Sequence, residues 1–175
     1  MVYTKKLNRM NMQQLLLIIT ATATGLIAGL FYAYSCSVNG GLAKLSDEAY
    51  LTAMQSINRE ILNPLFFATF IGTLFLLLLS TWLEYKSGIS TPFFILLGAS
   101  LCYLIGGFGV TIAVNVPLNE ALDKFNIHSA SVLDLATQRK SFEIPWNRFH
   151  EIRTMAAIAS FILVIIVCTG WFQKS

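Results

Sequence analysis

Three side chains that could contact one molecule occur close together between residues 146 and 153. Trp146, His150 and Arg153 fall within a stripe about 60° wide if this segment is a helix, because successive residues turn by 100°. Arg148 and Glu151 then point to other sides of the helix. The spacing therefore predicts a single wall that carries an aromatic plane, a titratable imidazole and a permanent cation.

Five asparagines are expected at the same end of the molecule as this wall: Asn58, Asn63, Asn115, Asn119 and Asn147. Amide groups around an apolar, aromatic-lined mouth would make a hydrogen-bonding pocket for a flat, oxygen-bearing lipophilic molecule. We therefore predict that His150 and Arg153 line one polar pocket together with Trp146 and the five asparagines.

Each of these residues also has a simpler explanation. Residues 154–172 make about 28 Å of helix, so Arg153 could mark the lipid boundary and extend to the headgroups, with Trp146 as an interfacial anchor. Asn63 before Pro64 is typical of a helix cap. Asn115 and Asn119 could end a helix around Pro117. These alternatives stay open at the level of sequence.

The sequence predicts no metal or cofactor. His128 and His150 are the only histidines, and no paired carboxylates accompany them at ligand spacing. Cys36, Cys102 and Cys168 each lie in an apolar segment and are expected to be small buried residues. We find no glycine-rich nucleotide loop, CxxC, HExxH or Ser/His/Asp pattern.

Four long apolar segments must position these side chains: residues 13–37, 64–83, 92–114 and 146–172. The chain has 175 residues, of which 55% are hydrophobic and only 12% charged. An apolar helix of about 20 residues spans the hydrocarbon of a bilayer, and uninterrupted apolar runs do not fit barrel strands. The expected fold is all-α, an antiparallel bundle of four transmembrane helices that forms one domain over residues 1–175.

The two long connections are expected to cap one end of this bundle. Ser46 followed by Asp47 and Glu48 indicates a helix start, and apolar residues then recur at helical spacing, so this amphipathic helix should cover the bundle. The second connection is expected to hold one short helix after Pro117 and another over residues 131–142, with Pro145 restarting the chain.

The basic residues predict the orientation. The N-terminal tail carries Lys5, Lys6 and Arg9, and the first helix usually dominates the positive-inside bias. We expect both termini inside, the two long connections outside, and a location in a bacterial inner membrane. The first apolar segment is longer than a signal-peptide core, so we expect it to remain as a helix.

Small residues repeat every fourth position in the first segment, at Ala21, Gly25, Gly29 and Ala33. Such a stripe lets another backbone approach closely. Packing within the chain is the favoured interpretation, and a homo-oligomer through the Gly25/Gly29 face is the alternative. The net charge of +3 is scattered, which argues against nucleic acid; the expected partners are membrane lipids and a lipophilic small molecule.

Five motifs in order resemble the anthrone oxygenase-like membrane proteins, also called domain of unknown function 1772. The motifs are the run from Gly25 to Ser35, Ala53 to Asn58, Asn63-Pro64, Asn115 to Asn119, and Trp146 to Arg153. The resemblance implies a four-helix membrane protein that inserts oxygen into a polycyclic phenol without a cofactor. Where the family usually has a proline after the first helix, this chain has Val38-Asn39-Gly40-Gly41, which puts the exit angle of that helix in question.

The resemblance also implies roles for the predicted site. An anthrone ionises to an electron-rich enolate that reacts with O₂ directly. His150 would be the base and Arg153 the counter-charge. Trp146 would be a stacking surface, and the hydrogen-bond donors would be Asn58, Asn115 and Asn119. The alternative from another class is a non-catalytic membrane protein that binds a lipid or quinone, or supports a membrane complex. A closed pocket beside His150 that is large enough for a fused-ring ligand would favour an enzyme or a binding protein, and solid packing there would favour a scaffold.

Overall fold

The computed structural model describes residues 12–170, and every regular element in this range is helical. The elements are α1 (Met12–Ala33), η1 (Tyr34–Val38), α2 (Asn39–Leu42), α3 (Asp47–Glu60), α4 (Pro64–Ser87), α5 (Thr91–Leu101), η2 (Cys102–Gly109), η3 (Thr111–Asn115), α6 (Val116–Asp123), η4 (Ile127–Ser129) and α7 (Val132–Cys168). Of these, η1, η2 and η3 are π-helical turns within longer rods, and η4 is a 3₁₀ turn.

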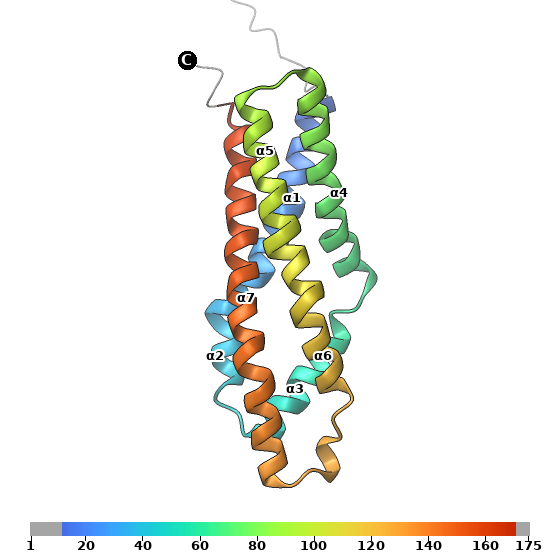
Figure 1. Cartoon of the computed structure of the whole chain (residues 1–175), viewed down its shortest axis with the longest axis vertical. Helices are drawn as coiled ribbons and strands as arrows, with labels where there is room; N and C mark the ends of the chain where they lie inside the picture. Colours follow the sequence, from blue (N-terminus) through green and yellow to red (C-terminus); the bar gives the residue numbers. More distant parts are fainter. Residues whose placement is uncertain (1–11, 171–175) are drawn as a thin grey trace, which may run out of the picture.

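Within residues 12–170, four rods are long and apolar enough to cross a membrane: Met12–Leu42, Pro64–Ser87, Thr91–Asp123 and Val132–Cys168. They form an elongated bundle, and α3 lies across its lower end in Figure 1. The predicted all-α, four-helix membrane bundle with a helical cap is confirmed. Lys5, Lys6 and Arg9, which carry much of the predicted orientation, lie outside the described residues.

Two prolines that were expected to separate helices do not do so. Pro117 follows the π-helical turn η3, in which Val116 donates to the carbonyl of Thr111. The wider π turn leaves room for a residue without an N–H, so the third rod continues to Asp123 instead of ending near residue 114. The expected short helix after Pro117 is therefore present as α6, but it continues the third rod without the expected break.

Pro145 likewise lies inside one continuous helix of 37 residues, α7. Phe142 and Trp146, on either side of the proline, are both buried, and their rings stack with centroids 6.2 Å apart. This packing holds the backbone helical although one hydrogen bond is lost at Pro145. The expected separate helix over residues 131–142 is therefore the first part of α7, whose total length of about 56 Å extends beyond a bilayer core of about 30 Å.

The rods pack around two groups of buried residues. The first lies between the four rods and includes Ile27, Phe70, Tyr103 and Val164. The second lies under the cap, where α3 meets α6 and α7. Trp146 belongs to this second group, so the predicted site sits at the junction between the membrane bundle and its cap.

Small residues let the rods approach one another. A Cβ atom placed on Gly106 would lie 2.5 Å from the Cβ of Ala156, so η2 and α7 touch where neither carries a large side chain. Gly25 faces the ring of Phe161 within the same chain, whereas Gly29 has open space beside it. The proposed oligomer through the Gly25/Gly29 face stays a prediction.

Replacing Gly106 with alanine should destabilise the bundle by about 1–3 kcal/mol, because the added methyl group overlaps Ala156 and forces two backbones apart. Thermal unfolding in detergent measures the effect. Gly72→Ala is the matched control, since nothing lies within 4 Å of that position. Equal melting temperatures for the two variants would contradict the close contact between η2 and α7.

Candidate functional site

A cavity lies at the junction of the bundle and its cap. Its lining comes from α1, α3, the start of α4, the end of the third rod, and α7. The residues are Leu30, Phe31, Tyr34, Ile57, Asn58, Ile61, Leu62, Phe66, Thr111, Val116, Asn119, Trp146, His150 and Arg153. The cavity has a volume of about 80 Å³ and is open to the outside at one end. This is smaller than the roughly 300–1,000 Å³ usual for small-molecule pockets, but the region beside His150 is not packed solid.

The wall on α7 has the composition that the helical spacing predicts. Trp146, His150 and Arg153 are buried, with 3%, 0% and 8% of their surface exposed. The Trp146 and His150 rings stack at 5.0 Å and 9°. The Arg153 guanidinium lies 4.5 Å from the Phe31 ring centre and 5.1 Å from that of Trp146. Arg153 and Trp146 therefore point into the protein and do not reach outward as lipid-boundary anchors.

The hydrogen bonds of His150 determine its tautomer. Arg153 places Nε and Nη2 at 3.1 and 3.0 Å from His150 Nδ1. A guanidinium can only donate, so Nδ1 is the acceptor and the ring proton of the neutral imidazole is on Nε2. The carbonyl oxygen of Phe31 and Oγ of Ser35 each lie 3.1 Å from Nε2. In this arrangement the basic lone pair of His150 is engaged by Arg153.

Arg153 has no carboxylate partner among the described residues. Its hydrogen bonds go to His150 and, at 3.5 Å, to Thr111 Oγ1. The ion pairs within residues 12–170 lie elsewhere, between Arg59 and Asp123 and between Arg139 and both Asp47 and Glu143. A buried cation without a counter-charge is costly in a low-dielectric interior. The site therefore offers a charge that an anionic oxygen in the cavity would neutralise.

Three of the predicted asparagines surround this wall. Asn58 lines the cavity and is 9% exposed, and its Nδ2 has no hydrogen-bond partner in the described structure. Asn119 also lines the cavity, and its Oδ1 accepts from the Trp146 indole at 2.8 Å. Asn115 lies behind the lining and donates to the carbonyl of Trp146 at 3.3 Å. Asn58 is thus a free donor, while the other two orient Trp146.

The remaining two asparagines lie off the cavity. Asn63 caps α4: its Oδ1 accepts from the Phe66 amide at 2.9 Å, while its Nδ2 donates to the carbonyl of Glu60 at 2.8 Å. The capping role noted as the alternative for Asn63 is therefore the one seen. Asn147 is half-buried and is not part of the cavity lining.

Several residues of the site come from segments that the spacing argument did not single out. Phe31, Tyr34 and Ser35 approach His150 from the end of the first rod, and Thr111 approaches Arg153 from the third. Tyr34, Ser35 and Thr111 belong to π-helical turns, which often mark functional sites. The Phe31 to Ser35 run was visible as a motif, but nothing local indicated that it faces His150.

No metal-binding cluster of three or more His, Cys, Asp or Glu side chains occurs in residues 12–170. Cys36 and Cys168 are exposed and Cys102 is half-buried, and all three are free thiols. The expectation that all three cysteines are buried was therefore wrong for Cys36 and Cys168, which lie on the outer surface of membrane-crossing rods.

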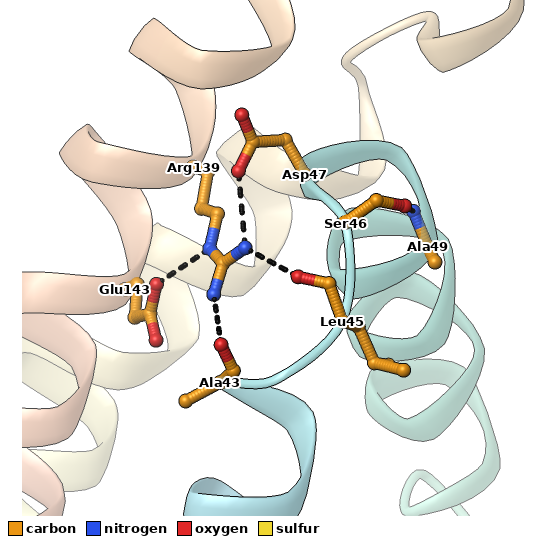
Figure 2. A network of polar contacts seen from close by, with 7 residues as sticks. All are labelled: Ala43, Leu45, Ser46, Asp47, Ala49, Arg139 and Glu143. Carbon is orange, nitrogen blue, oxygen red and sulfur yellow. Dashed lines mark hydrogen bonds and ion pairs between the residues drawn. The ribbon is translucent and has the colours of Figure 1, made fainter.

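The cap that carries Asn58 is fixed to α7 by Arg139 (Figure 2). Its guanidinium donates to the carbonyls of Ala43 and Leu45 at 3.0 and 2.8 Å, and it pairs with Asp47 and Glu143 at 3.0 and 2.7 Å. The same group lies 4.5 Å above the Tyr50 ring. Burial and the charge of Glu143 raise the pKa of the Tyr50 phenol, so this ring stays neutral beneath Arg139.

A second set of contacts fixes α3 to the third rod. Gln55 Nε2 donates to the carbonyls of Leu122 and Phe125 at 2.8 and 3.0 Å, and Arg59 pairs with Asp123 at 2.6 Å. The start of α3 is capped by Ser46, whose hydroxyl accepts from Ala49 as predicted. The position of Asn58 over the cavity therefore depends on polar contacts at both ends of α3.

Arg139→Ala should loosen the cap and destabilise the protein by about 1–3 kcal/mol, because two carbonyls and two carboxylates lose a shared donor. Arg139→Lys should restore little of the stability lost in Arg139→Ala, because an ammonium group cannot reproduce the planar set of N–H donors of a guanidinium. Hydrogen exchange should show faster exchange of α3 amides with α4 unchanged. Arg148→Ala, at an exposed position of the same helix, is the control. Unchanged α3 exchange in Arg139→Ala would refute the anchoring role.

Comparison with known proteins adds one match. A family model described as anthrone oxygenase matches residues 54–163, which is more than half of the chain. The matched range contains Asn58, Asn119, Trp146, His150 and Arg153, and leaves out the first rod. No curated protein and no solved structure matches this chain.

Proposed function

Because this chain belongs to the anthrone oxygenase family, we propose that it oxygenates a lipophilic polycyclic phenol of the anthrone type in the membrane, without a cofactor. The observation that supports this most directly is the buried Arg153 guanidinium, which has no carboxylate partner among the described residues and lines an apolar cavity. Such a site favours a ligand that develops negative charge on one oxygen and is otherwise flat and apolar.

The proposed reaction needs only the substrate and O₂. Loss of the benzylic proton gives an enolate, whose carbon reacts with O₂ to form a peroxide anion. Protonation gives a hydroperoxide that loses water and leaves a new carbonyl, so one O₂ yields one anthraquinone and one water. The protein contributes by stabilising the enolate oxygen and by excluding bulk water.

The residues suggest how deprotonation is coupled to binding. Arg153 covers Nδ1 of His150, which carries the only free lone pair of the neutral ring. When the guanidinium turns toward the substrate oxygen, Nδ1 becomes free to accept the benzylic proton. Asn58 Nδ2 donates a second hydrogen bond to the same oxygen or to a neighbouring phenol, and Trp146, whose own ring stacks on Phe142 and His150, lines the cavity beside the substrate rings.

Arg153→Met should lower anthrone oxygenation in reconstituted vesicles by about a hundredfold or more, the loss typical of removing one transition-state charge contact. His150→Gln should lower turnover while binding is retained, because the amide cannot take up a proton. Oxygen uptake and anthraquinone absorbance, corrected for spontaneous oxidation, measure both. Arg148→Met and His128→Gln, two exposed positions, are the controls. Full activity in both Arg153→Met and His150→Gln would refute the proposed mechanism.

A binding function without catalysis is the second candidate, and the cavity beside His150 supports it as well. The reconstituted vesicles described above can distinguish binding from catalysis. Retention of an anthrone or a quinone without oxygen uptake, in protein whose Arg153→Met variant no longer retains it, would identify a binding protein.

We also propose that both termini lie inside and the cavity faces outward across a bacterial inner membrane. The support is the basic N-terminal tail, with Lys86 in the last turn of α4. In a chain without its native cysteines, Ser129→Cys should react with an impermeant maleimide added to intact cells, and Ile89→Cys should not; both positions are exposed. The reverse labelling would invert the orientation.

A further inference from the structure

The mouth of the cavity lies at the corner between α3 and α4. Among the described residues that line the cavity, Leu62 is the one exposed side chain, at 62% of its surface. A residue that faces both the cavity and the outside must stand at the opening. Ile61 and Phe66 flank it, and we refer to Ile61, Leu62 and Phe66 as the mouth.

The cap is fixed on its other sides. Arg139 holds the chain before α3 to α7, while Gln55 and Arg59 hold α3 to the end of the third rod. At the α4 side, the contacts of Asn63 are local and join only the end of α3 to the first turn of α4. Apolar side chains alone therefore separate the cavity from the outside at the mouth.

The surroundings of the mouth are those of a lipid-facing surface. Leu65 and Phe67, in the first turn of α4, are exposed by 79% and 41%. The helix that carries them is 24 residues long and apolar enough to cross a bilayer. A mouth beside this first turn lies at the edge of the hydrocarbon, where flat molecules with an apolar body and a polar tip accumulate.

From these observations, we propose that the substrate enters the cavity sideways from the bilayer through the mouth, and that Leu62 controls the width of the path. This inference rests on the proposed function, which supplies a lipophilic ring system as the ligand. It assigns Leu62 a role in access and selectivity that is separate from the polar wall of Arg153, His150 and Asn58.

A gate residue has a kinetic signature that distinguishes it from a wall contact. Narrowing a path raises the barrier for association and dissociation equally and leaves the dissociation constant unchanged, whereas losing a contact in the bound state changes mainly the dissociation rate. Leu62→Phe should slow both rates by about tenfold, and Leu62→Ala should raise both. Leu65→Phe and Leu65→Ala, exposed neighbours outside the lining, should leave both rates unchanged.

The rates can be measured by stopped-flow fluorescence with dihydroxyanthraquinone as the probe. Trp82→Phe and Trp171→Phe leave Trp146 as the sole indole, so quenching reports arrival of the probe at the cavity wall.

A second experiment tests whether Leu62 faces lipid. A nitroxide attached at Leu62→Cys, in a chain without its native cysteines, should be relaxed more by O₂, which concentrates in the bilayer, than by a water-soluble nickel chelate. The same label at Ser129→Cys should show the opposite order.

Each result has a definite reading. Quenching that follows the Leu62 pattern, together with an O₂-relaxed nitroxide, supports access from the bilayer. If the probe quenches Trp146 at the same rates in all Leu62 and Leu65 variants, Leu62 does not control entry, and the proposed path through the mouth is refuted. That result leaves the proposed function unaffected. A nitroxide at Leu62→Cys that is relaxed mainly by the nickel chelate overturns access from the bilayer. If the protein never binds the probe, both the entry path through the mouth and the proposed function are refuted.

Discussion

A guanidinium held away from water in a membrane protein, with no carboxylate paired to it among residues 12–170, is the constraint around which this structure is arranged. Arg153 is enclosed by the rings of Phe31 and Trp146, and its donors reach only an imidazole nitrogen and a hydroxyl in the described structure. Aromatic faces and neutral acceptors reduce the cost of burying the charge but do not cancel it. The remaining positive electrostatic potential of Arg153 is directed into the cavity, where a negatively charged group of a ligand can neutralise it.

The other elements can be understood as supports for this arrangement. The stacked ring of His150 fixes two guanidinium nitrogens, and Asn115 and Asn119 fix Trp146 from the third rod. The cap then covers this end of the bundle, and its own position is set by Arg139 on α7. Because α7 carries both Arg139 and Arg153, the cap and the wall of the cavity are attached to the same continuous helix.

The features that depend on local chemistry were predictable from the sequence. Long apolar runs specify membrane helices, Ser46 and Asn63 are helix caps by type and position, and helical spacing places Trp146, His150 and Arg153 on one face. What could not be predicted depends on contacts between distant segments. Packing of Phe142 and Trp146 overrides the helix-breaking tendency of Pro145, and only the tertiary fold brings Phe31 and Ser35 to His150.

The π-helical turns let the third rod hold additional residues without changing the direction in which its polar groups point. A π turn contains about one residue more than an α-helical turn, so deleting one residue within Thr111–Asn115 would restore α-helical geometry and leave α6 at nearly the same rotation relative to α5. The same deletion within the regular helix α5 would rotate everything after it by about 100° and take Asn119 away from the indole of Trp146. Among distant relatives, a one-residue gap in the π turn would thus be compatible with the same polar site, whereas a gap in α5 would not.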